Sequence, residues 1–487
     1  MTNMGTYTDY FDYAVWFAYG QGMTRPHGAE PRGLNARIAL SPLHEGRFGR
    51  LFRRLPPAPW LPDEELQQVA ETMRETNVPG GGWGGAADTG DNPSIPAGYT
   101  YLGQFIDHDI TFDPQSRLDK ENDPDALVDF RTPRFDLDSV YGSGPDDEPF
   151  QYSRDSGRTR MLIGANSAGD EDLPRNVEDT ALIGDPRNDE NTIVGQLHLL
   201  FLKLHNKLMD QLDAEGALAP ELRFDEARRL ARWHYQWIVV EDYLPRVCGR
   251  DLLNKLWTTD PVSGLPEIRT RFYRPTKRPY MPVEFSVAAY RFGHSQIRGI
   301  YNLSDLVTDR PIFIAGPLPD EFADLRGFRA LPQQWTVDWT KFFAIDGSSP
   351  QPSRKIDAKL TPGLFDLPDG GGSLAFRNVK RGQALGLPSG QDVARAVNPQ
   401  QVLTGTELSA PEPTPLWFYI LKESELLAGG EHLGPVGGRI VAEVLLGLLR
   451  GDSQSFYGQQ PDWRPTLPDA DGDGRFTMAD LVKFVTG

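Results

Sequence analysis

Apolar residues recur every three or four positions along much of the chain, which is the spacing of one face of an amphipathic α-helix. The clearest segment runs from Thr192 to Leu212, and its apolar positions are Ile193, Leu197, Leu200, Phe201, Leu204 and Leu208. Asp185 and Pro186 precede it in the order of an N-cap and a first helical residue. A second long helix is predicted from about Asp225 to Val247, with a kink or an end at Pro245.

Two further segments have helical character. Gly437 to Leu449 is apolar on almost every side, which predicts a buried helix, and Asp63 to Thr76 predicts a helix near the N-terminus. Alternation of apolar and polar residues, the pattern of half-buried strands, is scarce. The predicted fold class is therefore mainly α, a helical core with long loops and little β-structure.

Composition divides the chain into three parts. Residues 1–95 are rich in Gly, Pro and Arg, which predicts an irregular N-terminal arm that wraps the core. Residues 96–450 contain the long helices and are predicted to form one catalytic domain. Residues 451–487 become polar again and predict an appended C-terminal tail.

Charge and cysteine content exclude several classes of protein. With 50 Lys and Arg against 68 Asp and Glu, the net charge of −18 disfavours binding to a nucleic-acid backbone. The single cysteine, Cys248, excludes an internal disulfide and is interpreted as a small core residue. Neither a run of 18 apolar residues nor a signal-peptide pattern occurs. We expect a soluble protein without a membrane span, cytoplasmic or exported without a recognisable signal peptide.

Polar side chains that are suited to catalysis or ligand binding are concentrated in the segment from Gly98 to Pro114, where Gln104 precedes Asp107, His108 and Asp109. Neighbouring residues on a helix point about 100° apart, so the last three cannot serve one small site. We expect each of them to have a different partner.

Two later segments could face such a histidine. Arg187 and Glu190 stand three apart, on one side of a helical turn, although a solvated helix start is the simpler interpretation. His198 and His205, in the helix that follows, are interpreted as structural histidines.

A second chemically interesting histidine, His294, directly follows Gly293. A lone histidine among aromatic residues usually belongs to the core, but a residue without a side chain lets a large flat ligand approach the backbone. Further along, Asn378 is suited to orient an imidazole and Arg381 to meet an anion, while a polar loop is the simpler interpretation.

Two oxygen-rich segments suggest cation sites. The first supplies Thr132, Asp136 and Asp138 with backbone carbonyls, and Asp109 could complete a Ca²⁺ cage. The second resembles a lone EF-hand loop or half of a dockerin repeat, with Gly474 at loop position 6. Its expected Ca²⁺ ligands, at positions 1, 3, 5, 7 and 12, are Asp469, Asp471, Asp473, Arg475 and Asp480.

Five motifs in a fixed order resemble the animal-type haem peroxidase family, within the peroxidase-cyclooxygenase superfamily, in a bacterial-looking version. The motifs are GQFIDHDITFDP, RTPRFDLDSVYGSGP, ALIGDPRNDENTIVGQLHLLFLKLHNKL, FSVAAYRFGHSQIRG and FRNVKRGQALGLP. The resemblance covers about residues 95–450. It implies the helical core of a haem peroxidase, haem b and Ca²⁺ as cofactors, and hydrogen peroxide as a substrate.

The resemblance also implies roles on the two sides of the haem. His108 corresponds to the distal histidine that takes a proton from peroxide, Arg187 to the distal arginine and Gln104 to the distal glutamine. His294 corresponds to the proximal ligand of the haem iron, and Asn378 to the residue that accepts its second ring N–H.

At the haem edge, Asp107 and Glu190 correspond to the carboxylates that the family esterifies to haem, and Arg291 and Arg381 to arginines near the propionates. For Ca²⁺, the resemblance implies a site made by Asp109, Thr132, Arg134 through its carbonyl, Asp136 and Asp138.

Two departures from the family pattern bear on the electron donor. Asn191 stands where the family's strongest chloride oxidiser has Met, and Arg291 stands where a cyclooxygenase has its radical Tyr. The expected donors are therefore bromide, iodide, thiocyanate or phenol-like molecules, rather than chloride or a fatty acid.

Two other functions remain open from the sequence. The doublet His108-Asp109 also occurs in metal-dependent phosphohydrolases of the HD type, which need more histidines at ligand spacing than a chain with 8 His readily supplies. The acidic loop from Asp469 to Asp480 suggests a calcium-dependent interaction module that binds a protein partner.

Overall fold

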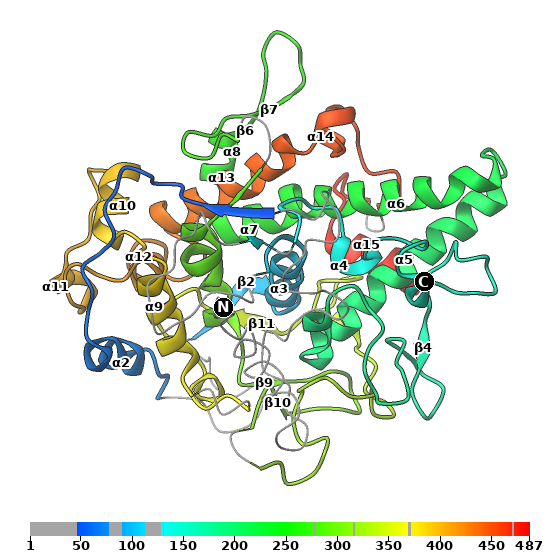
Figure 1. The fold of residues 1–487 in the computed structure, drawn as a ribbon, viewed down its shortest axis with the longest axis horizontal. Coiled ribbons are helices and arrows are strands. Elements are labelled where there is room, and N and C mark those ends of the chain that lie inside the picture. The colour runs from blue at the N-terminus through cyan, green and yellow to red at the C-terminus, as the bar shows by residue number, and fades with distance from the viewer. Residues whose placement is uncertain are drawn as a thin grey trace, which may run out of the picture.

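The computed structural model describes residues 46–76, 90–112, 128–129, 131–275, 279–314, 317–368, 372–469 and 472–487. Its regular structure is mainly helical, which confirms the predicted fold class (Figure 1). The longer helices are α2 (Asp63–Thr72), α3 (Gly98–Ile110), α5 (Thr192–Glu215), α6 (Pro220–Trp237), α9 (Leu374–Ala384), α10 (Gly390–Val397), α12 (Leu416–Ala428), α13 (Pro435–Gly451) and α15 (Met478–Thr486).

The longest helix, α5, begins at the predicted residue Thr192 and ends a few residues later than predicted. Its N-cap is Asn191, whose side chain accepts a hydrogen bond from the Val194 amide. Asp185, the predicted cap, instead caps the short helix η3 (Pro186–Asp189) by accepting from the Arg187 amide. The predicted cap therefore belongs to a separate turn in front of α5.

The second predicted helix is divided. α6 passes into a π-helical segment, η4 (Ile238–Tyr243), and then into α7 (Leu244–Cys248). Pro245 lies in the first turn of α7, directly after the π-helical segment, so the irregularity expected at this proline appears as a change of helix type just before it. Cys248 is buried, as predicted for a core residue.

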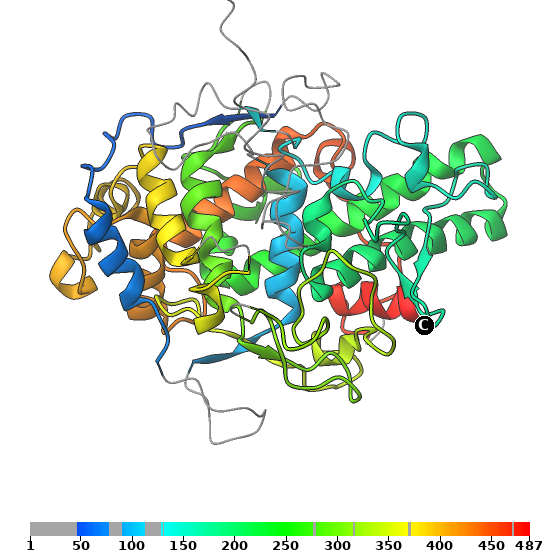
Figure 2. The same ribbon diagram turned by 60° about the horizontal axis from the view of Figure 1, so that its bottom comes forward.

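α3 lies near the centre of the molecule and is the light-blue helix in the middle of Figure 2. It packs against α5, η3 and the short helix η6 (Ala289–Gln296). Phe105 of α3 stacks on Phe201 of α5 with ring centroids 4.6 Å apart, and its ring edge meets Tyr235 of α6. These aromatic contacts fix α3 among the longest helices.

Strands are short and lie around the helices. β2 (Asp91–Pro96) pairs antiparallel with β11 (Pro352–Arg354) and leads directly into α3. β1 (Gly46–Gly49) pairs with β3 (Val128–Asp129) and β8 (Met281–Pro282). The other pairs are β4 (Gly164–Ala165) with β5 (Glu171–Asp172), β6 (Trp257–Thr259) with β7 (Pro266–Ile268), and β9 (Ile300–Tyr301) with β10 (Arg310–Pro311).

The remaining helical segments are short and lie between these elements. They are α4 (Asp138–Tyr141), η2 (Pro149–Gln151), α8 (Arg250–Leu256), η5 (Glu284–Ala288), η7 (Trp339–Lys341), η8 (Pro362–Leu364), α11 (Gly405–Leu408) and α14 (Phe456–Gln459). Among the described helices, none is both long enough and apolar enough to cross a membrane.

The C-terminal helix α15 packs against α5. The Met478 amide donates to Asp242 Oδ2 over 2.9 Å, and the Phe476 ring meets the edge of His234. The same oxygen of Asp242 accepts from the hydroxyl of Tyr99 at the start of α3. The tail is therefore tied to the central helix, and its apolar side chains are part of the same core cluster.

Candidate functional site

α3 directs its polar side chains to different surroundings, as the helical period predicts. His108 and Asp109 are buried, whereas Gln104 and Asp107, one turn apart, are partly exposed. The Asp107 carboxylate accepts from the Thr111 hydroxyl.

The imidazole of His108 is held by a residue that the sequence motifs did not single out. Its Nδ1 lies 2.8 Å from Oδ1 of Asn188, which follows Arg187 in η3. Burial and the nearby Arg187 guanidinium lower the pKa of His108, so the ring is neutral near pH 7. A neutral ring with a hydrogen-bonded Nδ1 is suited to accept a proton at Nε2.

Arg187 is fixed on several sides. Its Nη2 donates to the carbonyl oxygens of His108 and Thr111 at the end of α3, and its guanidinium lies 4.5 Å from the ring centre of Phe112. Asp185 accepts from Nε and Nη2. Nη1 has no hydrogen-bond partner among the described residues, which leaves it for a ligand.

Asp185 joins this arginine to a second one. Arg131 donates to Asp185 Oδ2 over 2.6 Å, and its Nη1 lies 3.6 Å from Asp138 Oδ1. Burial alone would raise the pKa of Asp185, but the guanidinium groups of Arg131 and Arg187 hold it well below its usual range. Asp138, Arg131, Asp185 and Arg187 thus form one buried chain of alternating charge.

Gln104 and Glu190 are brought together although 86 positions separate them in the sequence. Gln104 Nε2 donates to Glu190 Oε1, and Gln104 Oε1 accepts from Asn191 Nδ2 over 3.2 Å. The start of α5 and the central helix therefore share one polar cluster.

His294 and Asn378 are also paired, with Nδ1 of the ring 2.8 Å from Nδ2 of the amide. Asn378 Oδ1 accepts from Arg291 Nη1 over 3.0 Å. This orientation is opposite to the predicted one, because the guanidinium can only donate and therefore takes the amide oxygen. An iron ligand needs Nδ1–H and a bare Nε2. Asn378 would accept from that N–H only after a half-turn of its amide, which would end the hydrogen bond that it accepts from Arg291.

The surroundings of His294 fit a large flat group such as haem. A Cβ atom placed on Gly293 would meet no other atom within 4 Å, which confirms open space beside the backbone there. Gly293, His294 and Arg291 are partly exposed, although Phe292 between them is buried. Arg381, one turn after Asn378 on α9, is half-buried.

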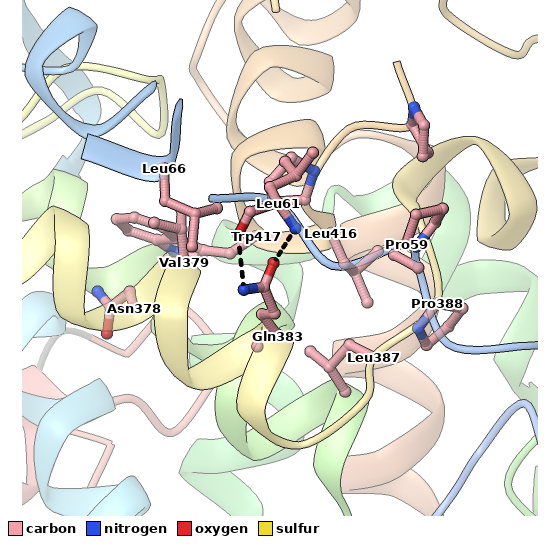
Figure 3. Close-up of a pocket in the computed structure, with 14 residues that line it drawn as sticks. Pro59, Leu61, Leu66, Asn378, Val379, Gln383, Leu387, Pro388, Leu416 and Trp417 are labelled. Carbon is pink, nitrogen blue, oxygen red and sulfur yellow. Dashed lines mark hydrogen bonds between the residues drawn. The ribbon is translucent and has the colours of Figure 1, made fainter. Parts of the chain in front are cut away.

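A pocket beside α9 adjoins the His294–Asn378 pair, because Asn378 is one of its lining residues (Figure 3). It is also lined by Trp417 and by residues of the N-terminal arm such as Leu61, whose backbone exchanges hydrogen bonds with Gln383 of α9. None of the predicted distal residues lines it.

The structure brings together the side chains that were predicted for the first cation site. Carboxylate oxygens of Asp109, Asp136 and Asp138 all lie within 4.8 Å of one another, and Asp136 accepts from the Thr132 hydroxyl. Burial and the neighbouring carboxylates raise the pKa of Asp109, and they raise that of Asp138 to about 7 although Arg131 opposes this. Asp138 Oδ1 is buried without a hydrogen-bond partner among the described residues. Three crowded acidic groups and a buried oxygen without a hydrogen bond fit a hard cation.

In the second predicted cation site, Asp471 lies outside the described residues. Asp469 accepts from the amides of Gly472 and Gly474, and Asp473 accepts from the amide of Arg475. Asp480 caps its own helix through Thr477. The described part is an ordered turn in front of α15.

Known proteins are similar to this chain in fold and, more distantly, in sequence. Peroxidase A from Dictyostelium discoideum superposes with a TM-score of 0.66 over 91% of this chain and 93% of its own, at 17% identity. The fatty acid alpha-dioxygenase of Oryza sativa superposes with a TM-score of 0.54 over 82% of this chain and 74% of its own, at 16% identity. The chain therefore has the same fold as these two proteins.

Residues 118–415 match the family model described as animal haem peroxidase, and the chain belongs to this family, whose cofactor is haem. The matched segment begins after α3. A peroxidase-like protein of Margaritifera margaritifera is 27% identical over an alignment of 360 positions that covers 59% of this chain and 44% of that protein. The chorion peroxidase of Aedes aegypti is 25% identical over 69% of this chain and 42% of its own length. The chain thus spans less than half the length of these curated relatives.

Proposed function

We propose that this protein is a hydrogen-peroxide-dependent haem peroxidase that oxidises bromide, iodide, thiocyanate or phenol-like donors. The observation that carries the proposal is a neutral, hydrogen-bonded His108 beside Arg187, whose guanidinium is held in place by hydrogen bonds. His294 lies on η6, which packs against α3, and there is open space beside it at Gly293. Family membership supports the same reaction.

In this proposal His294 binds the haem iron, and Arg291 and Arg381 meet the propionates. Bound haem supplies the two-electron reaction with peroxide and the oxidising power toward the donor. His108 takes a proton from the peroxide at Nε2, because Nδ1 is engaged by Asn188. Arg187 stabilises the negative charge that develops on the peroxide through Nη1.

Gln104 is proposed to hold water or a halide on the same side. Its hydrogen bond to Glu190 would then orient that carboxylate, which with Asp107 is proposed to form ester bonds to the haem. Extraction with acidified organic solvent tests this part: haem should stay on the polypeptide, and complete extraction would contradict ester formation.

The donor class rests on Asn191 and Arg291. Asn191 donates a hydrogen bond to Gln104 and caps α5. As an asparagine it has no thioether that could bond to a haem vinyl group. Arg291 donates to the Ser286 carbonyl and to Asn378, and it has no phenol to form a radical. Steady-state rates with chloride, bromide, iodide, thiocyanate and a phenol should be lowest for chloride.

Ca²⁺ is proposed to be bound by Asp109, Asp136, Asp138 and Thr132 with the Arg134 carbonyl. The loop with Asp469, Asp471, Asp473, Arg475 and Asp480 is proposed as a second site of the EF-hand or dockerin type, which a protein partner could recognise. Calcium analysis of the wild type and of Asp473→Asn distinguishes the two sites, because only the second would lose its ion in this variant.

The experiment that tests the main proposal is spectroscopic. Protein expressed with haem should show a Soret band and peroxidase turnover, and His294→Ala should lose both. Absence of the band, or full turnover in the variant, would refute the proposal. A phosphohydrolase would instead contain transition metal ions and no porphyrin, so metal analysis separates that alternative.

A further inference from the structure

We propose that Asn188 and His198 form a hydrogen-bonded chain with His108 that holds the His108 imidazole as the tautomer with Nδ1–H and a bare Nε2. The chain runs from His108 Nδ1 to Asn188 Oδ1 over 2.8 Å and from Asn188 Nδ2 to His198 Nδ1 over 2.9 Å. It joins α3, η3 and α5, the three elements that pack together at this site.

All three side chains are inside the protein. Asn188 and His198 are fully buried, and His108 is 4% exposed. The His198 ring packs edge-on against Phe105, and its Nε2 has no hydrogen-bond partner among the described residues. This histidine therefore differs from His205, whose two ring nitrogens are engaged by Tyr141 and Thr159 as expected for a structural residue.

The chain has a direction because each neutral imidazole has one N–H and one lone pair. If His108 donates from Nδ1, Asn188 must present its oxygen there, and its NH₂ group then points to His198. That NH₂ group needs a lone pair on His198 Nδ1, which places the His198 proton on Nε2. Burial lowers the pKa of His198 to about 3, so the ring stays neutral and has one nitrogen with a lone pair, which the proposed chain places at Nδ1.

His198 acts as a positioning residue, since it selects one of two nearly isosteric orientations of the Asn188 amide. Asn188 in turn keeps the Nδ1 proton of His108 in place. This inference rests on the proposed function, in which a peroxide proton moves to Nε2 and leaves a hydroperoxide anion beside Arg187. The resulting imidazolium still donates from Nδ1 to Asn188, so the chain does not have to rearrange during the transfer.

Nitrogen NMR of the ring-labelled, haem-free full-length chain tests the tautomers without any turnover. The chain has only 8 His, and His108→Gln and His198→Gln assign the two signals. We expect a protonated Nδ1 and bare Nε2 for His108, and the reverse for His198. The opposite pair of tautomers, or averaging of either ring between both, would overturn the inference.

Two isosteric variants sharpen the test. Asn188→Asp keeps the acceptor for His108 but removes the NH₂ group, so His198 should switch to the Nδ1–H tautomer while His108 stays unchanged. Asn188→Leu removes both bonds, and His108 should then populate both tautomers. An unchanged His198 in Asn188→Asp would refute the chain.

Variants of His198 give a second route that leaves Asn188 intact. His198→Leu removes the acceptor for the amide, so the His108 tautomer should become mixed. His198→Gln offers a carbonyl oxygen in its place and should restore the single tautomer. Equal behaviour of the two variants would contradict a positioning role for His198.

Kinetics of the haem-loaded enzyme provide the functional measurement. General-base catalysis contributes roughly 100- to 10,000-fold, so loss of its positioning in Asn188→Leu should lower kcat/KM for peroxide by ~10- to 100-fold. The kcat/KM for the donor should change little, and Asn188→Asp should retain most of the peroxide rate. If the tautomers are as expected but the wild type lacks peroxide turnover, the proposed function is refuted and the hydrogen-bonded chain of His108, Asn188 and His198 is supported. Reversed tautomers in an active enzyme would refute the chain alone.

Discussion

Asp185 holds the Arg187 guanidinium with both of its carboxylate oxygens, and its Oδ2 lies 2.8 Å from Arg187 Nη2. The same oxygen accepts from Arg131, which lies beside Asp138 in the candidate Ca²⁺ site. The positive group proposed to meet peroxide is therefore joined to the cation site by buried ion pairs. A change at one end is expected to reach the other.

Replacing Asp185 with Asn should strongly destabilise the protein. The carboxylate is completely buried between Arg131 and Arg187, and its loss removes the counter-charge of Arg187 and the closer of the two counter-charges of Arg131. Breaking a buried pair in this way costs roughly 3–5 kcal/mol, which urea denaturation would measure. A matched control is Glu171→Gln, which breaks the exposed pair with Lys203 and should leave the unfolding midpoint almost unchanged. Equal effects of the two substitutions would contradict the conclusion that Asp185 stabilises the two buried arginines.

The carboxylates of the candidate Ca²⁺ site should give stability an unusual pH dependence when no cation is present. Because burial and nearby carboxylates raise the pKa of Asp138 to about 7, the folded chain binds more protons there than the unfolded chain does. Stability should therefore fall as pH rises from about 4, the ordinary carboxyl pKa, to about 7. Thermal unfolding in a chelator should show this decline.

Added Ca²⁺ should reverse the trend, because the cation binds the ionised carboxylates and offsets their repulsion. Asp138→Asn removes one of the charges and should flatten the pH profile in the chelator. A profile in wild type that is the same with Ca²⁺ and with chelator would mean that this cluster binds no cation.

Removal of residues 465–487 should destabilise the core, although the sequence predicts an appended tail. Met478, Leu481 and Val482 are at most 1% exposed and belong to the main core cluster. A fully buried side chain of this kind contributes roughly 1.5–3 kcal/mol, so the truncated chain should unfold at a clearly lower temperature. Asp473→Asn, which keeps these contacts, is the control and should leave the melting temperature in chelator unchanged. A truncated chain as stable as the full chain would show that the docked tail contributes nothing.

The long helices were predictable because their apolar period is local information. This period predicts α5 and α13. It does not predict the change to a π-helical segment after Trp237, because apolar residues continue through that segment. Asp185 illustrates a second limit. The pattern Asp-Pro correctly predicts a cap, but only tertiary contacts show that the capped turn is η3 and that the side chain also holds two arginines.

The site shows the same division between local and long-range information. His108, Arg187 and His294 stand out as residue types within motifs, whereas Asn188 has no signal beyond its place after Arg187. Its role depends on contacts with His108, 80 positions earlier, and with His198 on the next helix. The amide orientation of Asn378 was also beyond prediction, because it depends on competition from the Arg291 guanidinium.

Replacing Asp109 with Ala should disturb peroxide chemistry without removing any group proposed to contact the haem. Asp109 is fully buried, and its carboxylate accepts from the Leu137 amide and lies within the carboxylate cluster. Its loss should weaken Ca²⁺ binding and loosen the segment that carries Asp138, and with it the ion pairs that reach Arg187. Calcium content, the Soret spectrum and kcat/KM for peroxide should be measured on the same preparation. We expect less Ca²⁺ and a lower peroxide rate at unchanged haem occupancy. Normal calcium content and normal turnover would mean that the cation site and the peroxide site are independent.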